Sequence, residues 1–188
     1  LRVMSFNVRC PSKNDGANRW EHRRDLLVQT IKLKNPDLIG TQELYEEQGR
    51  YIVEKAPEYA WFGISRRGNH EDEHMGVFYR KGRLTPVESG NFWLSETPDV
   101  PASQSWDMSL PRMVTWARFR TSKGNHFVYY NTHFPHRNQD EQARLQCARL
   151  IASRIAALNK NEPFLLTGDF NAPAGGPVQA VLTATLTD

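Results

Sequence analysis

Runs of apolar residues divide the first third of the chain into strands and helices. Residues 3–8 alternate as a strand does, and residues 20–34 place apolar side chains three or four positions apart, as one stripe of a helix does. Residues 37–43 ("DLIGTQE") are predicted to form a second strand and residues 46–55 a second helix, and "YAWFGI" from Tyr59 is a third strand. This part of the chain therefore alternates strands with helices.

The middle of the chain shows two pairs of strand-like runs. "HMGVFYRKGRLTPVESGNFWLS" pairs two runs across Lys81 and Gly82, and "TWARFRTSKGNHFVYYNTHF" pairs two more across residues 122–125, so we predict two antiparallel hairpins. Residues 96–110 between them form a long loop rich in Pro, Ser and Asp that contains Trp106. Long ordered loops often bind ligands, so we expect a binding loop, with a disordered connector as the alternative.

The last part of the chain returns to helices and a strand. Residues 144–158 carry apolar residues at helical spacing, "FLLTGDF" from Phe164 is the next strand, and "VQAVLTATLTD" is a further helix. Hairpins mixed with helical connections argue against an all-parallel doubly wound sheet. We expect an α+β fold in which stacked sheets are covered by helices, with residues 1–188 forming one domain.

Composition excludes few functions. With 39% hydrophobic and 24% charged residues, the chain has the balance of a folded, soluble protein rather than a disordered one. The net charge of +3 does not by itself indicate nucleic-acid binding. Cys10 and Cys147 lack metal-ligand spacing and are expected to be reduced thiols.

Location and partners are only weakly constrained by the sequence. No stretch is apolar enough for a membrane span or a signal segment, so we expect no stable membrane insertion. The chain starts at Leu1, which leaves a cytoplasmic protein and one exported after leader removal as alternatives. No obligate protein partner is evident from the sequence.

Polar residues stand at the ends of four predicted strands. They are Asn7, Glu43, His133, and Asp169 with Asn171. Taken singly, an Asp or Asn at such a place often caps a turn, and a histidine is often a hydrogen-bonded structural residue. Glu43 is harder to explain in that way, because a carboxylate that ends an apolar strand needs a partner or water. A hard cation held by carboxylates would suit phosphoester hydrolysis.

The ordered set "FN", "QE", "NTH" and "GDFN" resembles the motifs of the endonuclease/exonuclease/phosphatase superfamily, the deoxyribonuclease I-like proteins, from Arg2 to about Asp188. The resemblance implies a four-layer α/β/β/α sandwich whose site lies at one edge. It also implies hydrolysis of a phosphomonoester or phosphodiester by in-line attack of an activated water, with Mg²⁺ as cofactor and Mn²⁺ as a substitute.

Roles follow from the same resemblance, position by position. Glu43 would ligate the metal, with Asn7 assisting in the metal or phosphate shell. Asp169 would orient or deprotonate the attacking water, and Asn171 would hydrogen-bond the phosphoryl oxygens. His133 would donate to the phosphate and protonate the leaving group.

Three further residues are candidates for substrate binding. Arg112 resembles a phosphate-facing arginine of some relatives, although arginines at strand edges are often solvated. His74 precedes a hairpin strand and is a candidate to approach the site, with a polar surface role as the alternative. Trp106 would line the pocket. The pair His133 and His136 also suggests zinc, but H-x-x-H in an irregular segment lacks the fixed geometry of helical zinc pairs.

Members of the superfamily normally end with further strands and a Ser-Asp-His segment, which this chain does not contain. We therefore expect a C-terminally incomplete domain that lacks the last strands and hydrolyses phosphoesters weakly on its own. A non-catalytic phosphoester-binding module is the alternative from another class. Calcineurin-like phosphoesterases share "GNHE" and "GDF", but in them the order is reversed.

The substrate class remains open between a small phosphorylated molecule and a nucleic acid. Residues 96–110 contain no Lys or Arg, which disfavours a long nucleic-acid contact there. "SRRGNH" at residues 65–70 offers two arginines, enough for a phosphate but hardly for a duplex. We therefore favour a small or medium phosphorylated substrate and keep a nuclease as the alternative.

Overall fold

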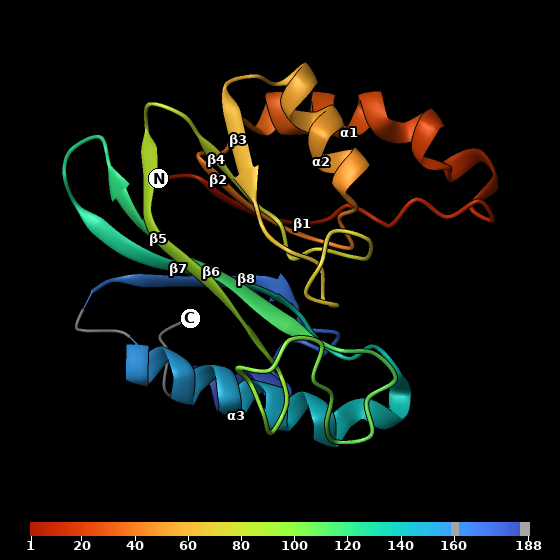
Figure 1. Ribbon diagram of the computed structural model, residues 1–188, viewed down its shortest axis with the longest axis vertical. Coiled ribbons are helices and arrows are strands. Elements are labelled where there is room, and N and C mark those ends of the chain that lie inside the picture. Colours follow the sequence, from red (N-terminus) through yellow and green to blue (C-terminus); the bar gives the residue numbers. More distant parts are fainter. Residues whose placement is uncertain (159–161, 185–188) are drawn as a thin grey trace.

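The computed structural model describes residues 1–158 and 162–184 and contains two four-stranded sheets that face each other (Figure 1). The first sheet has the strand order β1 (Val3–Asn7), β2 (Leu38–Gln42), β4 (Val77–Arg80), β3 (Tyr59–Phe62). The second has the order β5 (Leu84–Trp93), β6 (Met113–Thr121), β7 (His126–His133), β8 (Phe164–Asp169). Strands β1 and β2 are parallel, as are β7 and β8, and the other pairs are antiparallel.

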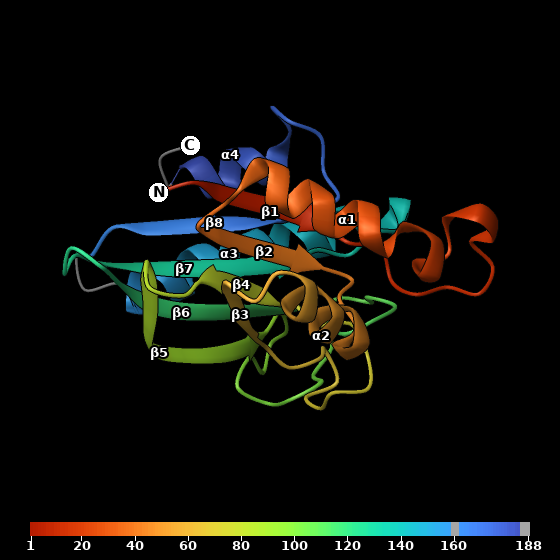
Figure 2. The same ribbon diagram turned by 90° about the horizontal axis from the view of Figure 1, so that it is seen from above.

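Helices cover the outer face of each sheet. Helices α1 (Trp20–Lys34) and α2 (Glu46–Lys55) lie on the first sheet, and α3 (Glu141–Leu158) and α4 (Pro177–Thr183) lie on the second (Figures 1 and 2). Short 3-10 turns, η1 (Gly16–Asn18) and η2 (Asn138–Asp140), precede α1 and α3. The four-layer α+β sandwich predicted from the sequence is confirmed. Among the described residues, no helix has both the length and the apolar character needed to cross a membrane.

The two sheets are held together by side chains that alternate along their central strands. In β2, Ile39 belongs to the cluster with Ile31 and Ile52 of the covering helices, whereas its neighbour Leu38 belongs to the cluster with Tyr129 of the second sheet. All five residues of β2 are buried, because this strand has a packed layer on each side.

The prediction of an antiparallel hairpin across Lys81 and Gly82 is wrong. Strands β4 and β5 follow each other in the chain but belong to different sheets: Phe78 of β4 is paired with Ile39 and Trp61, and Trp93 of β5 with Met113. The chain leaves one sheet through the turn at residues 81–83 and enters the other. Period-two apolar patterning identifies a strand but not its partner, which depends on where both faces of the strand can be buried. The second predicted hairpin, β6 with β7, is confirmed.

Other differences from the sequence prediction lie at element ends and in the long loop. Helix α3 begins at Glu141, three residues earlier than expected, after a turn in which Arg137 is hydrogen-bonded to Asp140. The predicted C-terminal helix is α4, and its expected continuation over residues 185–188 lies outside the described part of the chain. Residues 96–110 are not a disordered connector, since Asp99 pairs with Arg154 of α3.

One close approach brings the ends of the two sheets together. A side chain at Gly40 of β2 would collide with Tyr129, Asn131 and Thr167 of the second sheet. Asn131 spans the gap, because its Nδ2 donates to the carbonyl oxygen of Thr41 (2.8 Å) and its Oδ1 accepts from Gln42 Nε2 (2.9 Å). The carboxyl end of β2 is therefore fixed against β7 and β8.

Candidate active site

Four strand ends meet at one edge of the sandwich. Parallel pairing sets Asn7 at the end of β1 beside Gln42 of β2, and His133 at the end of β7 beside Asp169 of β8. Across the two sheets, the Ser5 hydroxyl donates to the carbonyl oxygen of Gly168 (3.3 Å). Segments far apart in the chain thus deliver their polar terminal residues to a common place.

Asn7 lies at the centre of this group. Its side-chain nitrogen donates to Glu43 Oε1 (2.9 Å) and to Asp169 Oδ2 (3.0 Å), so two carboxylates from different sheets lie on one amide. The amide oxygen accepts from the backbone N–H of Arg9 (2.9 Å). His133 Nε2 lies 3.8 Å from Asp169 Oδ2. The structure therefore brings Asn7, Glu43, His133 and Asp169 together.

Glu43 follows the last residue of β2 and has a left-handed backbone with φ of 59°, which is uncommon for a glutamate. Its Oε2 accepts from the backbone N–H of Cys10 (3.1 Å) and lies 3.7 Å from the Arg9 guanidinium. Burial alone would raise the pKa of Glu43, but the hydrogen bonds from Asn7 and Cys10 outweigh it and lower the pKa. The carboxylate is thus ionised and oriented.

His133 is almost fully buried, with 4% of its surface exposed. Burial, followed by the positive charge of Arg112, lowers the pKa of His133 to about 4, and the nearby charge of Asp169 opposes this. Its Nδ1 has no hydrogen-bond partner among the described residues. The imidazole is therefore neutral at pH 7, with Nε2 directed at Asp169 and Nδ1 buried without a partner.

Asn171 lies in a turn that fixes Asp169. Its backbone N–H donates to Asp169 Oδ1 (3.1 Å), and its side-chain nitrogen donates to the carbonyl oxygen of Phe134 (3.0 Å). Between them, Phe170 packs edge-on against the ring of Phe134, with the centroids 5.2 Å apart. The apolar residue and the Asn171 side chain thus anchor the turn, while Asp169 faces the site.

Arg112 contributes a buried positive charge. Only 3% of its surface is exposed, its Nη2 lies 3.1 Å from His136 Nδ1, and its Nη1 has no hydrogen-bond partner. Among the described residues, no carboxylate forms an ion pair with Arg112. The other buried arginine near the site, Arg66, differs in this respect, because it pairs with Asp72 (3.0 Å) and Glu73 (2.7 Å). A buried guanidinium with an unused donor suits an anion such as phosphate.

Two residues that the sequence analysis missed lie beside Glu43. Ligand atoms of Cys10, Glu43 and Glu73 are all within 4.8 Å of one another. Burial raises the pKa of Glu73 despite the opposing charge of Arg66, so a cation would offset an unfavourable buried charge. Glu73 lies in an irregular segment and does not end a strand. Only its position next to the candidate residue His74 in the sequence could have suggested a role in the site.

Among the described residues, His74 and Trp106 form no hydrogen bond or ion pair with this group. His74 is fully buried, and its ring faces Leu44, His70 and Glu46 rather than Asp169. Trp106 packs against the apolar cluster beneath the second sheet. His136 contacts Arg112, and neither His133 nor His136 belongs to the two groups of potential metal ligands found among the described residues.

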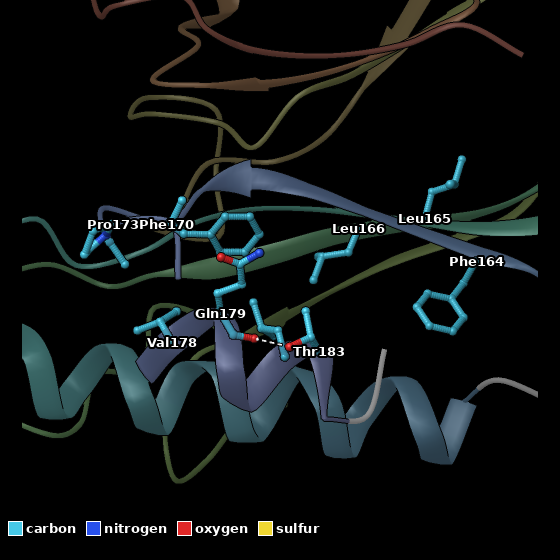
Figure 3. A pocket seen from close by; sticks show the side chains of 11 residues that line it. Phe164, Leu165, Leu166, Phe170, Pro173, Val178, Gln179 and Thr183 are labelled. Atoms are coloured by element: carbon cyan, nitrogen blue, oxygen red, sulfur yellow. Dashed lines mark hydrogen bonds between the residues drawn. The ribbon is translucent and has the colours of Figure 1, made fainter. Parts of the chain in front are cut away.

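A separate pocket lies between β8 and α4 (Figure 3). Its labelled side chains include Phe164, Leu166 and Phe170 from the strand side and Val178 from α4. The hydroxyl of Thr183 is hydrogen-bonded within α4 to the carbonyl oxygen of Gln179 (3.0 Å), which the dashed line marks. None of the lining residues is ionisable, so this pocket contains no group for acid–base or metal chemistry.

The sandwich and its polar edge define the class as a deoxyribonuclease I-like fold with acid, amide and imidazole groups at its strand ends. The chain belongs to the endonuclease/exonuclease/phosphatase family, whose model matches residues 4–183.

Solved structures support this membership. A mannosyl-6-phosphatase from Bacteroides thetaiotaomicron is 35% identical with a TM-score of 0.91, and the alignment covers 98% of this chain and 70% of that one. A family member from Bacteroides vulgatus is 34% identical with a TM-score of 0.93, covering 99% and 71%. Nocturnin of Drosophila melanogaster is 26% identical over 93% of this chain, which spans only 27% of that protein.

Proposed function

We propose that this protein is a divalent-metal-dependent phosphoesterase, with the edge formed by Asn7, Glu43, His133 and Asp169 as its active site. The observation that carries the proposal is the placement of Glu43 and Asp169, from different sheets, within 3.0 Å of one amide nitrogen. Groups so far apart in the chain converge in this way where they act on one ligand. The family membership supports the same reaction class.

The donor atoms fit a hard dication. Glu43 and Glu73 would hold the ion through carboxylate oxygens that lie close together, and Asn7 would assist by orienting Glu43 through its side-chain amide. Oxygen donors of this kind suit Mg²⁺, with Mn²⁺ as a substitute, whereas the nearby Cys10 sulfur is a softer ligand. When bound, such an ion neutralises charge on the phosphoryl oxygens.

The protein's own groups divide the remaining work. Asp169 accepts a proton from, or orients, the water that attacks phosphorus, and Asn171 holds Asp169 in place and hydrogen-bonds a phosphoryl oxygen. The ester P–O bond breaks as the new P–O bond forms. His133, neutral at pH 7, donates an N–H hydrogen bond to the phosphate, and the leaving alkoxide takes its proton from water. Arg112 binds the phosphate charge through its unused donor.

We favour a small phosphomonoester as the substrate. A mannosyl-6-phosphatase is among the relatives of more than 30% identity, which makes a sugar phosphate the first class to test. The loop at residues 96–110 carries no Lys or Arg that could follow a nucleic-acid backbone, and its Asp99 is paired with Arg154.

The test is a hydrolysis screen in Mg²⁺ with the longest natural protein that contains this chain. The panel comprises 6-phosphorylated mannose and other phosphomonoesters, a nitrophenyl phosphodiester, plasmid DNA and RNA. Glu43→Gln is expected to lower kcat/KM by at least about 100-fold, since it removes the charge on the metal ligand. Glu88→Gln, an exposed residue on β5, is the matched control. Turnover that survives Glu43→Gln would refute the site, and phosphate binding without any turnover would indicate a binding module.

A further inference from the structure

A second cluster of metal-binding side chains lies outside the proposed active site. It comprises Glu46 at the first turn of α2, His70 in the segment between β3 and β4, and His74 further along that segment. Glu46 Oε2 lies 3.1 Å from His70 Nδ1 and 4.0 Å from His74 Nε2, and the two histidine nitrogens are 3.5 Å apart. None of these residues belongs to the group around Asn7.

The orientation of His74 is fixed by its surroundings. Its side chain is fully buried, and its Nδ1 lies 3.1 Å from the carbonyl oxygen of Leu44. A carbonyl can only accept, so Nδ1 carries the proton and Nε2 presents a lone pair to Glu46 and His70. Trp61 packs edge-on against the ring, with centroids 5.7 Å apart. A histidine held through its other nitrogen in this way is typical of metal ligands.

Glu46 has one oxygen in use and one without a hydrogen-bond partner. Oε1 accepts from Arg50 (2.7 Å), the next turn of the same helix. Oε2 is buried and has no aligned hydrogen-bond donor among the described residues, even though His70 is close. Glu46 Oε2, His70 Nδ1 and His74 Nε2 therefore face one another within 4.8 Å, an arrangement that an ion between them would stabilise when His70 presents its lone pair at Nδ1.

We propose that Glu46, His70 and His74 form a second metal site, for a transition-metal dication such as Zn²⁺. Tetrahedral ligands about 2.0 Å from zinc lie about 3.3 Å from each other, which is close to the separations here. Two imidazoles and one carboxylate favour Zn²⁺ over Mg²⁺, unlike the oxygen donors around Glu43. His70 is 63% exposed, so the fourth position is open to water.

The site would tie two parts of the protein together. Glu46 belongs to α2, whereas His70 and His74 flank the acidic residues that pair with Arg66. Glu73 directly precedes His74 in the chain. A bound ion would thus hold the segment that delivers Glu73 to Glu43, and it would stabilise the fold by linking that segment to a helix.

The experiment is a titration of metal-stripped protein with Zn²⁺ in a large excess of Mg²⁺, followed by calorimetry. We expect one equivalent of tightly bound Zn²⁺ and a rise in Tm. His70→Ala, at an exposed position that folding tolerates, and Glu46→Gln should each weaken binding by on the order of 100-fold. His22→Ala, an exposed histidine on α1, should leave binding unchanged.

A Co²⁺ substitution separates this site from the group around Cys10. Co²⁺ at the proposed site should give visible d–d bands of a tetrahedral complex without the near-ultraviolet band of a cobalt–thiolate bond, and Cys10→Ser should not change the spectrum. Three results would overturn the proposal: no Zn²⁺ binding in excess Mg²⁺, undiminished binding in His70→Ala, or a thiolate band that disappears in Cys10→Ser.

Discussion

The contact at Gly40 predicts the most severe effect of a single added methyl group in this fold. The Cβ of Gly40→Ala would lie closer than ordinary Cβ contacts to the Tyr129 hydroxyl, the Asn131 side-chain oxygen and the Thr167 hydroxyl. All three belong to the second sheet, and Tyr129 and Asn131 are fully buried. The sheets must separate locally or these side chains must move.

The size of the effect follows from two costs. Overpacking a buried position typically costs about 1–3 kcal/mol. Displacing Asn131 also breaks its hydrogen bonds to Thr41 and Gln42, and each buried polar group left unpaired costs about 1–3 kcal/mol. We expect Gly40→Ala to lower the free energy of unfolding by about 2–6 kcal/mol, the sum of the overpacking cost and one unpaired buried polar group, which is a large part of the 5–15 kcal/mol typical of a domain.

The assay is urea denaturation followed by circular dichroism, with Thr167→Ala as the partner variant. If the contact is the cause, the double variant should be more stable than the sum of the two single changes predicts, because Thr167→Ala removes one clashing atom. Gly124→Ala meets no atom within 4 Å but has φ of 87°, so it reports the cost of a left-handed backbone, which Gly40 does not have, without any clash. A loss below about 1 kcal/mol for Gly40→Ala would contradict the reasoning.

Two further predictions concern charged groups. Burial would raise the pKa of Asp140, but hydrogen bonds from Arg137 outweigh this effect and lower the pKa. The ionised carboxylate therefore stabilises the fold fully at pH values above its unfolded pKa of about 3.9, and this stabilisation is lost as the pH falls through the folded pKa. Asp140→Asn should lower the free energy of unfolding at pH 7 by about 1–3 kcal/mol. Denaturation curves should show the difference in stability between wild type and variant shrinking below about pH 4, and a difference that stays constant with pH would contradict this. Arg112→Lys keeps the charge but loses the planar fork, so steady-state kinetics should show KM and the inhibition constant of inorganic phosphate rising on the order of tenfold, whereas unchanged values would exclude a phosphate contact.

The alternation of apolar residues identified most elements correctly, with errors of a few residues at their ends. It did not identify the pairing partner of β4, because the pattern of "VFYR" predicts a strand but not the sheet to which that strand belongs. Phe78 packs with Ile39 beneath the helices while Val77 packs between the sheets, so both faces of β4 are satisfied in the first sheet. A short turn after Arg80 does not force the next strand to pair with it.

The residues of the candidate site also divide into those that the sequence pattern identified and those that it missed. Asn7, Glu43, His133 and Asp169 were recognised because each ends a strand, where a polar residue after an apolar run needs an explanation. Glu73 escaped notice because its segment has no regular pattern and its partner, Arg66, lies seven residues earlier in an irregular turn. His74 was expected near the substrate, but the structure places it beside Glu46 and His70.

Local periodicity and residue chemistry were enough to place the strands and helices, the layered α+β class and the polar residues at the strand ends. Three features could be known only from the folded molecule: which strands share a sheet, how closely the sheets approach at Gly40, and which charged groups face one another. These depend on the burial of both faces of each strand and on distances between segments remote in the chain, and no local pattern encodes them.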